Sequence, residues 1–401
     1  MIHRKELRIA GCVTLALTIG FLAGGCSSET SDDPIVGTRA QHDADVLRDT
    51  GAPGVLALVH LDGQVIRTRS GVADVKTNAA IAENATFRAA SVMKTFVATV
   101  VLQLVAEKKL ALGDTLKKLL PEVLVAKSGN DGAKVTLRHM LQQTSGLYDY
   151  RKALPADESE ESYLRHRFDT YTESELTQKA MQHAPDFIPD PEHPRWQYSN
   201  TNYLLLARIV EKTTGRDWER EIEARIFERL HLTGAKLPGN DAHLPSPFLA
   251  GYEKFATEGE LVDVTLRSAS AAGAAGSLVA TTDDLDTFFR ALADGTLLPP
   301  AELAEMQKTV AADDYAALMP GIRYGLGVFW YPLSCGGGYW NGLGDTLGYM
   351  VRTAVTADGR RSAVVAVSTG QGHDTKDVVR QDALVRTLID RALCAPMQWP
   401  L

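Results

Sequence analysis

Ser91 and Lys94 stand three residues apart, and a serine hydroxyl beside a lysine amine is a pair suited to acyl transfer. In a helix both side chains would emerge on the same face, because one turn separates them. An almost unbroken apolar run follows at 95–105, so we expect a buried helix that begins at or just before Ser91. Burial would let the Lys94 ammonium lose its proton more easily and act as a base. Because a chain of this length contains about one Ser-x-x-Lys by chance, the pair needs support from elsewhere.

Tyr198 and Asn200 are the second group of residues with useful chemistry, two positions apart in a short turn ahead of a predicted helix at 202–214. A phenol held near an ammonium is stabilised as phenolate, so Tyr198 could exchange protons with Ser91. The Asn200 carboxamide could donate to Lys94 or to a substrate amide. The alternative is an ordinary turn that caps the next helix, and the sequence at 339–341 has the same Tyr-x-Asn spacing.

The elements that must position these residues fall into two groups. Strand patterns occur near both ends of the chain, with the turn signal Asp62-Gly63 between the first two, at 54–60, 64–69, 326–330, 349–355 and 362–367. Helical patterns are expected at 39–50, 202–214, 218–230 and 378–393. Between about 110 and 260 the chain reads as helices joined by loops. We therefore predict an α+β fold, with an antiparallel β-sheet flanked by helices plus an all-helical region.

The N-terminal 26 residues have the pattern of an export signal rather than of the fold. A positively charged start is followed by an apolar stretch at 9–23, which is short for a membrane span, and by Cys26. This resembles a bacterial lipoprotein signal with Cys26 as the lipidated residue, although Ala23 replaces the usual Leu. We expect a polar tether at 27–37 and the folded domain at 38–401. The protein is then exported and lipid-anchored to the outer face of the cytoplasmic membrane, or otherwise secreted.

The charge, the cysteines and the absence of metal-binding motifs in the sequence bear on the partners, the disulfide and the cofactors that we expect. Without residues 1–26 the chain has 39 Lys/Arg and 49 Asp/Glu, a formal charge of −10, and no basic run, so nucleic acid is not an expected partner. Cys335 and Cys394 remain, and an even pair in an exported protein predicts a disulfide, the alternative being two free thiols. The sequence contains no His-Glu-x-x-His and no Cys-x-x-Cys, so we expect neither a metal nor a cofactor.

Five ordered segments, taken together, resemble the serine hydrolases of the class C β-lactamase and D-alanyl-D-alanine carboxypeptidase group, a penicillin-binding-protein-like family. They lie at 51–54, 87–96, 135–147, 198–203, and 275–279 with 282–285. The resemblance implies a sheet flanked by helices, a second helical region and an active cleft between them. It also implies that Ser91 is the nucleophile, Lys94 its base partner and Tyr198 a second proton carrier.

The third motif of that family departs from the pattern in this chain. Where the family carries a His-Thr-Gly or Lys-Thr-Gly strand, this sequence has Gly342 and Leu343, and only Gly344 agrees. The oxyanion hole uses backbone N–H groups, here those of Ser91 and Asp345, so it need not be lost. A charge-assisted bond to a substrate carboxylate would be missing. Arg323, Arg352 and His373 could replace the basic residue, but we interpret each as a solvated surface side chain.

We therefore expect an exported serine hydrolase that forms an acyl-enzyme at Ser91, of the D-alanyl-D-alanine carboxypeptidase-like or β-lactamase-like type. Its partner would be a small-molecule or peptide acyl substrate, such as a peptidoglycan stem peptide or a β-lactam, and it would meet a membrane only through the lipid anchor. One alternative is a carboxylesterase on small acyl esters. Another is a non-turnover protein that binds β-lactams or peptidoglycan.

Overall fold

The computed structural model describes residues 34–124, 128–155, 159–190, 192–256, 259–370 and 375–396. The expected signal with Cys26, most of the tether and His373 lie outside these ranges. Residues 34–37, which we expected in the tether, instead form the first turn of helix α1 (Pro34–Arg48), and Val36 packs on the core beside it. Among the described residues, no helix is both long enough and apolar enough to cross a bilayer.

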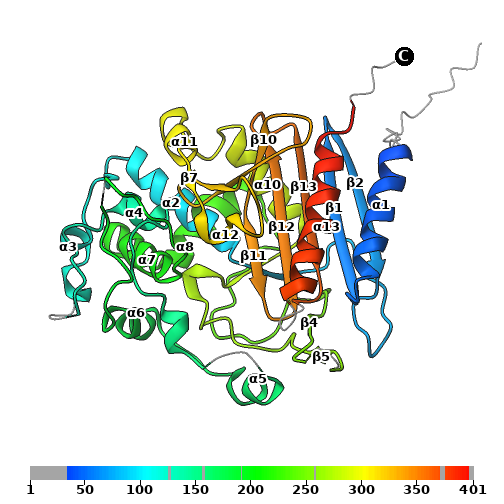
Figure 1. The fold of residues 1–401 in the computed structure, drawn as a ribbon, viewed down its shortest axis with the longest axis horizontal. Helices are drawn as coiled ribbons and strands as arrows, with labels where there is room; N and C mark the ends of the chain where they lie inside the picture. The colour runs from blue at the N-terminus through cyan, green and yellow to red at the C-terminus, as the bar shows by residue number, and fades with distance from the viewer. Residues whose placement is uncertain are drawn as a thin grey trace, which may run out of the picture. The chain divides into compact units, whose positions relative to one another are not determined.

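The central element is one antiparallel sheet of nine strands built from both ends of the chain (Figure 1). Strand β1 pairs with β2 on one side and with β13 on the other, with Val55 opposite Val367. The order is β2-β1-β13-β12-β10-β9-β8-β7, and β11 pairs with β12 off this path. The strands are β1 (Gly54–Leu61), β2 (Gln64–Gly71), β7 (Val310–Ala311), β8 (Arg323–Tyr324), β9 (Phe329–Pro332), β10 (Gly338–Asn341), β11 (Leu343–Thr346), β12 (Tyr349–Thr356) and β13 (Arg361–Val367).

Both faces of the sheet are covered, so its central strands are apolar on both sides. Helices α1 and α13 (Thr375–Leu393) pack on one face, against Val55 and Val365 among others. Helices α2 (Met93–Ala106) and α10 (Thr282–Ala293) lie on the opposite side, where Phe96 and Phe288 stack in the larger core cluster. All eight residues of β1 are buried as a result. This confirms the predicted antiparallel sheet flanked by helices.

Between α2 and the short strand β4, the residues that the structure describes form mainly helices and loops. Helix α7 lies against α2 and α6, and a single π-helical turn (Glu223–Phe227) joins α8 to α9. The helices are α3 (Leu116–Leu119), α4 (Leu137–Leu141), α5 (Glu160–His166), α6 (Glu173–Met181), α7 (Thr201–Thr214), α8 (Trp218–Ile222) and α9 (Glu228–Leu230), with 3-10 turns at Pro121–Val123 and Tyr150–Ala153. Later short elements are β4 (Tyr252–Glu253), β5 (Val262–Asp263), α11 (Pro300–Met306) and α12 (Asp313–Ala316).

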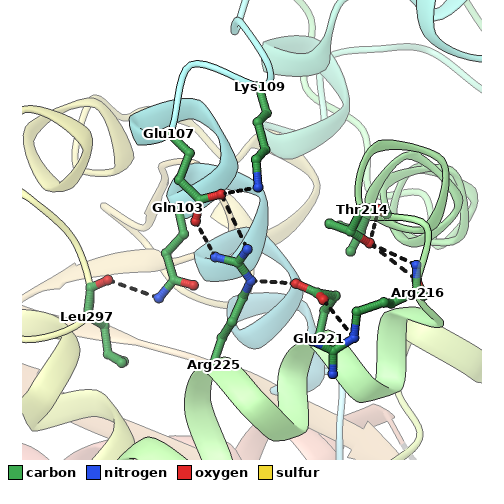
Figure 2. Close-up of polar contacts among 9 residues, drawn as sticks. Gln103, Glu107, Lys109, Thr214, Arg216, Glu221, Arg225 and Leu297 are labelled. Carbon is green, nitrogen blue, oxygen red and sulfur yellow. Dashed lines mark hydrogen bonds and ion pairs between the residues drawn. The ribbon is translucent and has the colours of Figure 1, made fainter.

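A polar cluster joins the C-terminal end of α2 to this helical segment (Figure 2). Glu107, the residue after α2, accepts a hydrogen bond of 2.5 Å from Arg225, and Arg225 also donates to the buried Glu221 of α8 at 2.5 Å. Bonding to Arg225 lowers the pKa of Glu107 to about 2. Since α2 carries Lys94 in its first turn and begins two residues after Ser91, this cluster fixes the far end of the helix that positions them.

Cys335 and Cys394 form the predicted disulfide. Cys335 lies in the turn between β9 and β10, and Cys394 follows the last residue of α13. The bond therefore fastens the C-terminal helix to the strands at one side of the sheet. Asp390 of α13 supports the same junction by accepting bonds from the backbone N–H and hydroxyl of Ser334.

Candidate active site

Ser91 lies in a tight turn between the short strand β3 (Phe87–Ala90) and helix α2. The helix begins at Met93, so our expectation of a helix starting at or before Ser91 was wrong. Ala90 has φ +49°, and this left-handed conformation of a non-glycine residue breaks the helical path just ahead of the serine. The Ser91 carbonyl accepts a bond of 3.0 Å from the Lys94 backbone N–H, and this single turn keeps both side chains on one side.

Lys94 is buried, with 2% of its surface exposed, and its amine has three oxygen neighbours. Nζ lies 3.0 Å from Ser91 Oγ, 2.8 Å from Asn200 Oδ1 and 2.6 Å from the Ala275 carbonyl oxygen. Removal from water lowers the pKa of Lys94 to about 7, and the charge of Asp149 opposes part of that shift. The amine is therefore within reach of its neutral form near neutral pH.

The hydrogen-bond directions are consistent with Lys94 acting as the base. Asn200 Oδ1 and the Ala275 carbonyl can only accept, so they use the two N–H bonds of a neutral amine. The remaining lone pair then faces Ser91 Oγ. In that state the Ser91 hydroxyl donates to Lys94, which is the arrangement needed to take its proton.

Tyr198 completes the set, since its phenol donates to Ser91 Oγ at 2.9 Å. Its ring also lies under the lysine amine, with 4.7 Å between Nζ and the ring centroid. Burial raises the pKa of Tyr198 well above its usual value. The phenolate is not favoured at rest, because loss of solvent outweighs the nearby amine, whose own pKa is depressed. Tyr198 is a neutral donor before the reaction.

Asn200 has its orientation fixed by Asp149, a residue that sequence reasoning missed. Asn200 Nδ2 donates to Asp149 Oδ2 at 2.9 Å, which turns Oδ1 toward Lys94. Asn200 thus accepts from the lysine, whereas we had expected it to donate. The signal for Asp149 was its place directly after the segment at 135–147, but nothing in the sequence showed which side chain it would meet.

Gly344 and Asp345 lie on β11, which runs beside the nucleophile. A Cβ on Gly344 would stand 2.2 Å from the Ala89 carbonyl oxygen, so only glycine allows β11 to approach β3 this closely. Asp345 faces the same cleft as Ser91, with about half of its side chain exposed (53%). Ser91 and Asp345, whose backbone N–H groups we expect to form the oxyanion hole, therefore line the same cleft.

Our interpretation of Arg352 as a solvated surface side chain was wrong, because the residue is buried. Its guanidinium pairs with Asp345 at 2.9 Å and with Asp382 of α13 at 2.7 Å, so it holds the cleft carboxylate rather than a substrate. Arg323 is exposed and donates to Thr309.

The cleft has a volume of about 340 Å³ and contains Ser91, Tyr198 and Asn200. Tyr315, Phe329 and Leu343 give it an aromatic and apolar wall. Arg151, in the 3-10 turn Tyr150–Ala153, and Arg267, in a loop, also line it, and both were missed because they are far apart in the sequence. In the part of the chain that the structure describes, no three His, Cys, Asp or Glu side chains are grouped as a metal site would require.

Comparison with known proteins places this geometry in context. A family model described as Beta-lactamase matches residues 39–388. The structure is similar to a D-stereospecific amidohydrolase from Streptomyces sp., with a TM-score of 0.78 and 33% identity over 90% of this chain and 99% of that one. A D-amino acid amidase from Ochrobactrum anthropi shares the fold, with a TM-score of 0.75, 24% identity and coverage of 90% and 97%.

Two of the curated relatives that match in sequence illustrate the range of the family. Penicillin-binding protein 4 of Amycolatopsis lactamdurans is 26% identical over 288 residues, which cover 69% of this chain and 71% of the relative. Esterase EstB of Burkholderia gladioli is 29% identical over 185 residues, a little under half of each chain (46% and 47%). The relatives thus include proteins named for amide, ester and penicillin chemistry.

Proposed function

Because the chain belongs to the beta-lactamase family, whose members include serine hydrolases, we propose that it forms an acyl-enzyme at Ser91 and hydrolyses amide or ester bonds. The observation that carries this proposal is the contact of Ser91 Oγ with both Lys94 Nζ and Tyr198 Oη. A nucleophile that touches a base and a separate proton donor has what acyl transfer requires.

Acylation begins when neutral Lys94 takes the hydroxyl proton of Ser91 and Oγ attacks the carbonyl carbon. The backbone N–H groups of Ser91 and Asp345 stabilise the oxyanion. Tyr198 gives its proton to the departing nitrogen or oxygen, which leaves an acyl-serine, a lysine ammonium and a phenolate. The adjacent ammonium stabilises the phenolate in this intermediate.

Deacylation restores every group. The Tyr198 phenolate takes a proton from water as the water oxygen attacks the acyl carbonyl, and the Ser91 oxygen leaves with the proton held by Lys94. The product is a carboxylic acid, and serine, lysine and tyrosine return to their starting states. No other proton carrier is needed, because in each cycle Lys94 takes up one proton and returns it, and Tyr198 gives up one proton and regains it.

The charges around the cleft favour substrates that have no carboxylate beside the scissile bond. Gly342 itself lies against Phe289 and Val92. The strand side of the cleft is lined by Leu343, Asp345, Thr346 and Leu347, with no basic side chain, and the Asp345 carboxylate would repel an anion there. We therefore place amides and esters, including amides of D-amino acids, ahead of D-alanyl-D-alanine peptides and β-lactams. Carboxypeptidase-like or β-lactamase-like activity is the second candidate, supported by Arg151 and Arg267, which bring positive charge to another part of the cleft.

The proposal is tested with D-phenylalanine amide, p-nitrophenyl acetate, a D-alanyl-D-alanine peptide and nitrocefin. We expect turnover of the amide or the ester, a loss of at least about 100-fold in Ser91→Ala, and mass added to the Ser91 peptide by a fluorophosphonate or a fluorescent penicillin. Faster turnover of the peptide or nitrocefin would favour the second candidate. Labelling of Ser91 without product release would indicate a non-turnover binding protein, and no labelling at all would contradict the enzyme.

Export completes the proposed function. Residues 1–26 support a lipoprotein-type signal with Cys26 as the anchored residue, and the Cys335–Cys394 disulfide fits an oxidising compartment. The hydrolase would then act outside the cytoplasmic membrane, where small acyl and peptide substrates of the cell envelope are found. Fractionation of the full-length protein and of Cys26→Ala tests this proposal.

A further inference from the structure

Tyr198 and Asn200 sit on one short segment, and its backbone is held by a buried glutamine that has no part in the chemistry described above. We propose that Gln143 is a positioning residue that fixes the 197–202 segment, and with it both proton-handling side chains, against Ser91 and Lys94. The inference rests on the proposed function, because it assigns a role in the same reaction.

Three hydrogen bonds join Gln143 to the segment. Its backbone carbonyl accepts from Gln197 N at 3.0 Å, and its side-chain Oε1 accepts from Ser199 N at 3.0 Å. The same Oε1 accepts from Asn202 Nδ2 at 2.6 Å. Gln197 and Ser199 are the two neighbours of Tyr198, so Gln143 holds the backbone on both sides of the phenol.

The conformation of Gln143 is costly and therefore informative. It has φ +62°, in the left-handed region that favours glycine, and its side chain is fully buried. A non-glycine residue is strained in this region and persists there only where its surroundings require it. Glycine would relieve the strain but would remove Oε1, so the side-chain acceptor is what a glutamine provides here.

Other contacts of the segment lie farther from the phenol or bind a single atom of it. The Tyr198 backbone N–H donates to Asp314, and Asn202 Oδ1 accepts from Ser145. Asn200 donates to Asp149, and Thr201 Oγ1 donates to the Tyr148 carbonyl and accepts from the Tyr150 N–H. The two catalytic contacts, Tyr198 Oη to Ser91 and Lys94 Nζ to Asn200 Oδ1, both depend on where this backbone lies. A shift of about 1 Å would break both contacts together, which lowers the rate of the chemical step more than substrate binding.

The test compares Gln143→Leu, which removes the acceptor at similar volume, with Gln143→Glu, which keeps it. Gln142→Leu is the matched control, because Gln142 is the adjacent buried glutamine and donates to the Lys308 carbonyl, away from the segment. With p-nitrophenyl acetate we expect Gln143→Leu to lower kcat by about 10- to 100-fold with KM changed less than about 3-fold. Gln143→Glu should keep at least about a fifth of kcat, and Gln142→Leu should stay within about 3-fold of wild type.

Crystal structures of wild type and Gln143→Leu give a readout that does not depend on activity. The distance from Tyr198 Oη to Ser91 Oγ should exceed hydrogen-bond range in the variant. An unchanged distance, an unchanged kcat, or an equal loss in Gln143→Glu or Gln142→Leu would each overturn the role of Gln143. If wild type itself neither turns over substrate nor is acylated, the proposed function fails, and the structural comparison still decides the role of Gln143.

Discussion

Lys94 shows how burial changes the chemistry of one residue. In water a lysine amine is protonated at neutral pH and has no lone pair to offer. Here the surrounding α2, α7 and the loop at 273–276 exclude water, which lowers the pKa of Lys94 to about 7, while Asn200 and Ala275 set the direction of its N–H bonds. The same burial raises the pKa of Tyr198 and keeps it protonated. One environment thus prepares a base and an acid on either side of Ser91.

This argument predicts the pH dependence of the reaction. The base must be unprotonated, so kcat/KM for a neutral ester should rise about tenfold per pH unit below a pKa near 7 and level off above it. Lys94→Arg should lower kcat/KM by roughly 100- to 10,000-fold, since a guanidinium does not lose its proton. Stopped assays from pH 5 to 9 measure both effects, with the exposed Lys109→Arg as control. A flat profile across pH 7 would argue against Lys94 as the base.

At the scale of elements, the site depends on two backbone segments that approach without side chains between them. Strand β3 carries the chain to Ser91, and β11 runs close beside it because Gly344 has no Cβ. The left-handed Ala90 then turns the chain into α2, so that the serine projects into the cleft while Lys94 enters the core. Neither strand is longer than four residues. Strand β3 is held by pairing with β6 (Leu278–Ala280), and β11 is held by pairing with β12.

Gly344→Ala should therefore disturb the site through the backbone. The added methyl would lie 2.2 Å from the Ala89 carbonyl, so β11 must move away from β3 and the Asp345 N–H with it. We expect kcat to fall about 10- to 100-fold and the free energy of unfolding to fall by about 1–3 kcal/mol. Gly113→Ala is the control, because its Cβ would meet no atom within 4 Å. Enzyme kinetics and urea unfolding measure the two effects. A wild-type kcat in Gly344→Ala would contradict the role of Gly344 in positioning β11.

At the scale of the whole molecule, the two ends of the chain close the sheet. Strand β1 near the start pairs with β13 near the end, and α1 packs beside α13 on the same face. The Cys335–Cys394 bond, which spans 59 positions of sequence, fastens α13 to this assembly. On the chain-entropy model such a loop contributes about 4 kcal/mol to the free energy of unfolding.

The export proposed above would therefore affect both the stability and the location of the protein. Full-length protein made in a bacterial host should fractionate with membranes and contain no free thiol at 335 or 394, and Cys26→Ala should release it from the membrane fraction. A chain without residues 1–26, kept in the cytoplasm, should have two titratable thiols. Its free energy of unfolding should be about 4 kcal/mol lower than that of the disulfide-bonded protein. Persistent membrane association of Cys26→Ala would contradict lipidation, and free thiols in the full-length protein would contradict export.

The sequence by itself determined the features that depend on local pattern. Alternation and apolar runs gave the sheet strands at both ends and the long helices, and the order of five motifs pointed to Ser91, Lys94 and Tyr198. It also predicted the disulfide. Short strands such as β3, β10 and β11 were missed, because four residues carry too little periodicity to be read alone.

Only the tertiary structure decided the electrostatics and the supporting contacts. The neutral phenol of Tyr198 and the inward-facing Arg352 depend on burial, which is set by elements distant in sequence. The hydrogen bonds of Asp149 to Asn200 and of Gln143 to Ser199 likewise join residues more than 50 positions apart. Charge state and hydrogen-bond direction follow from such long-range neighbours, so a linear pattern that names the reacting residues cannot give their protonation or alignment.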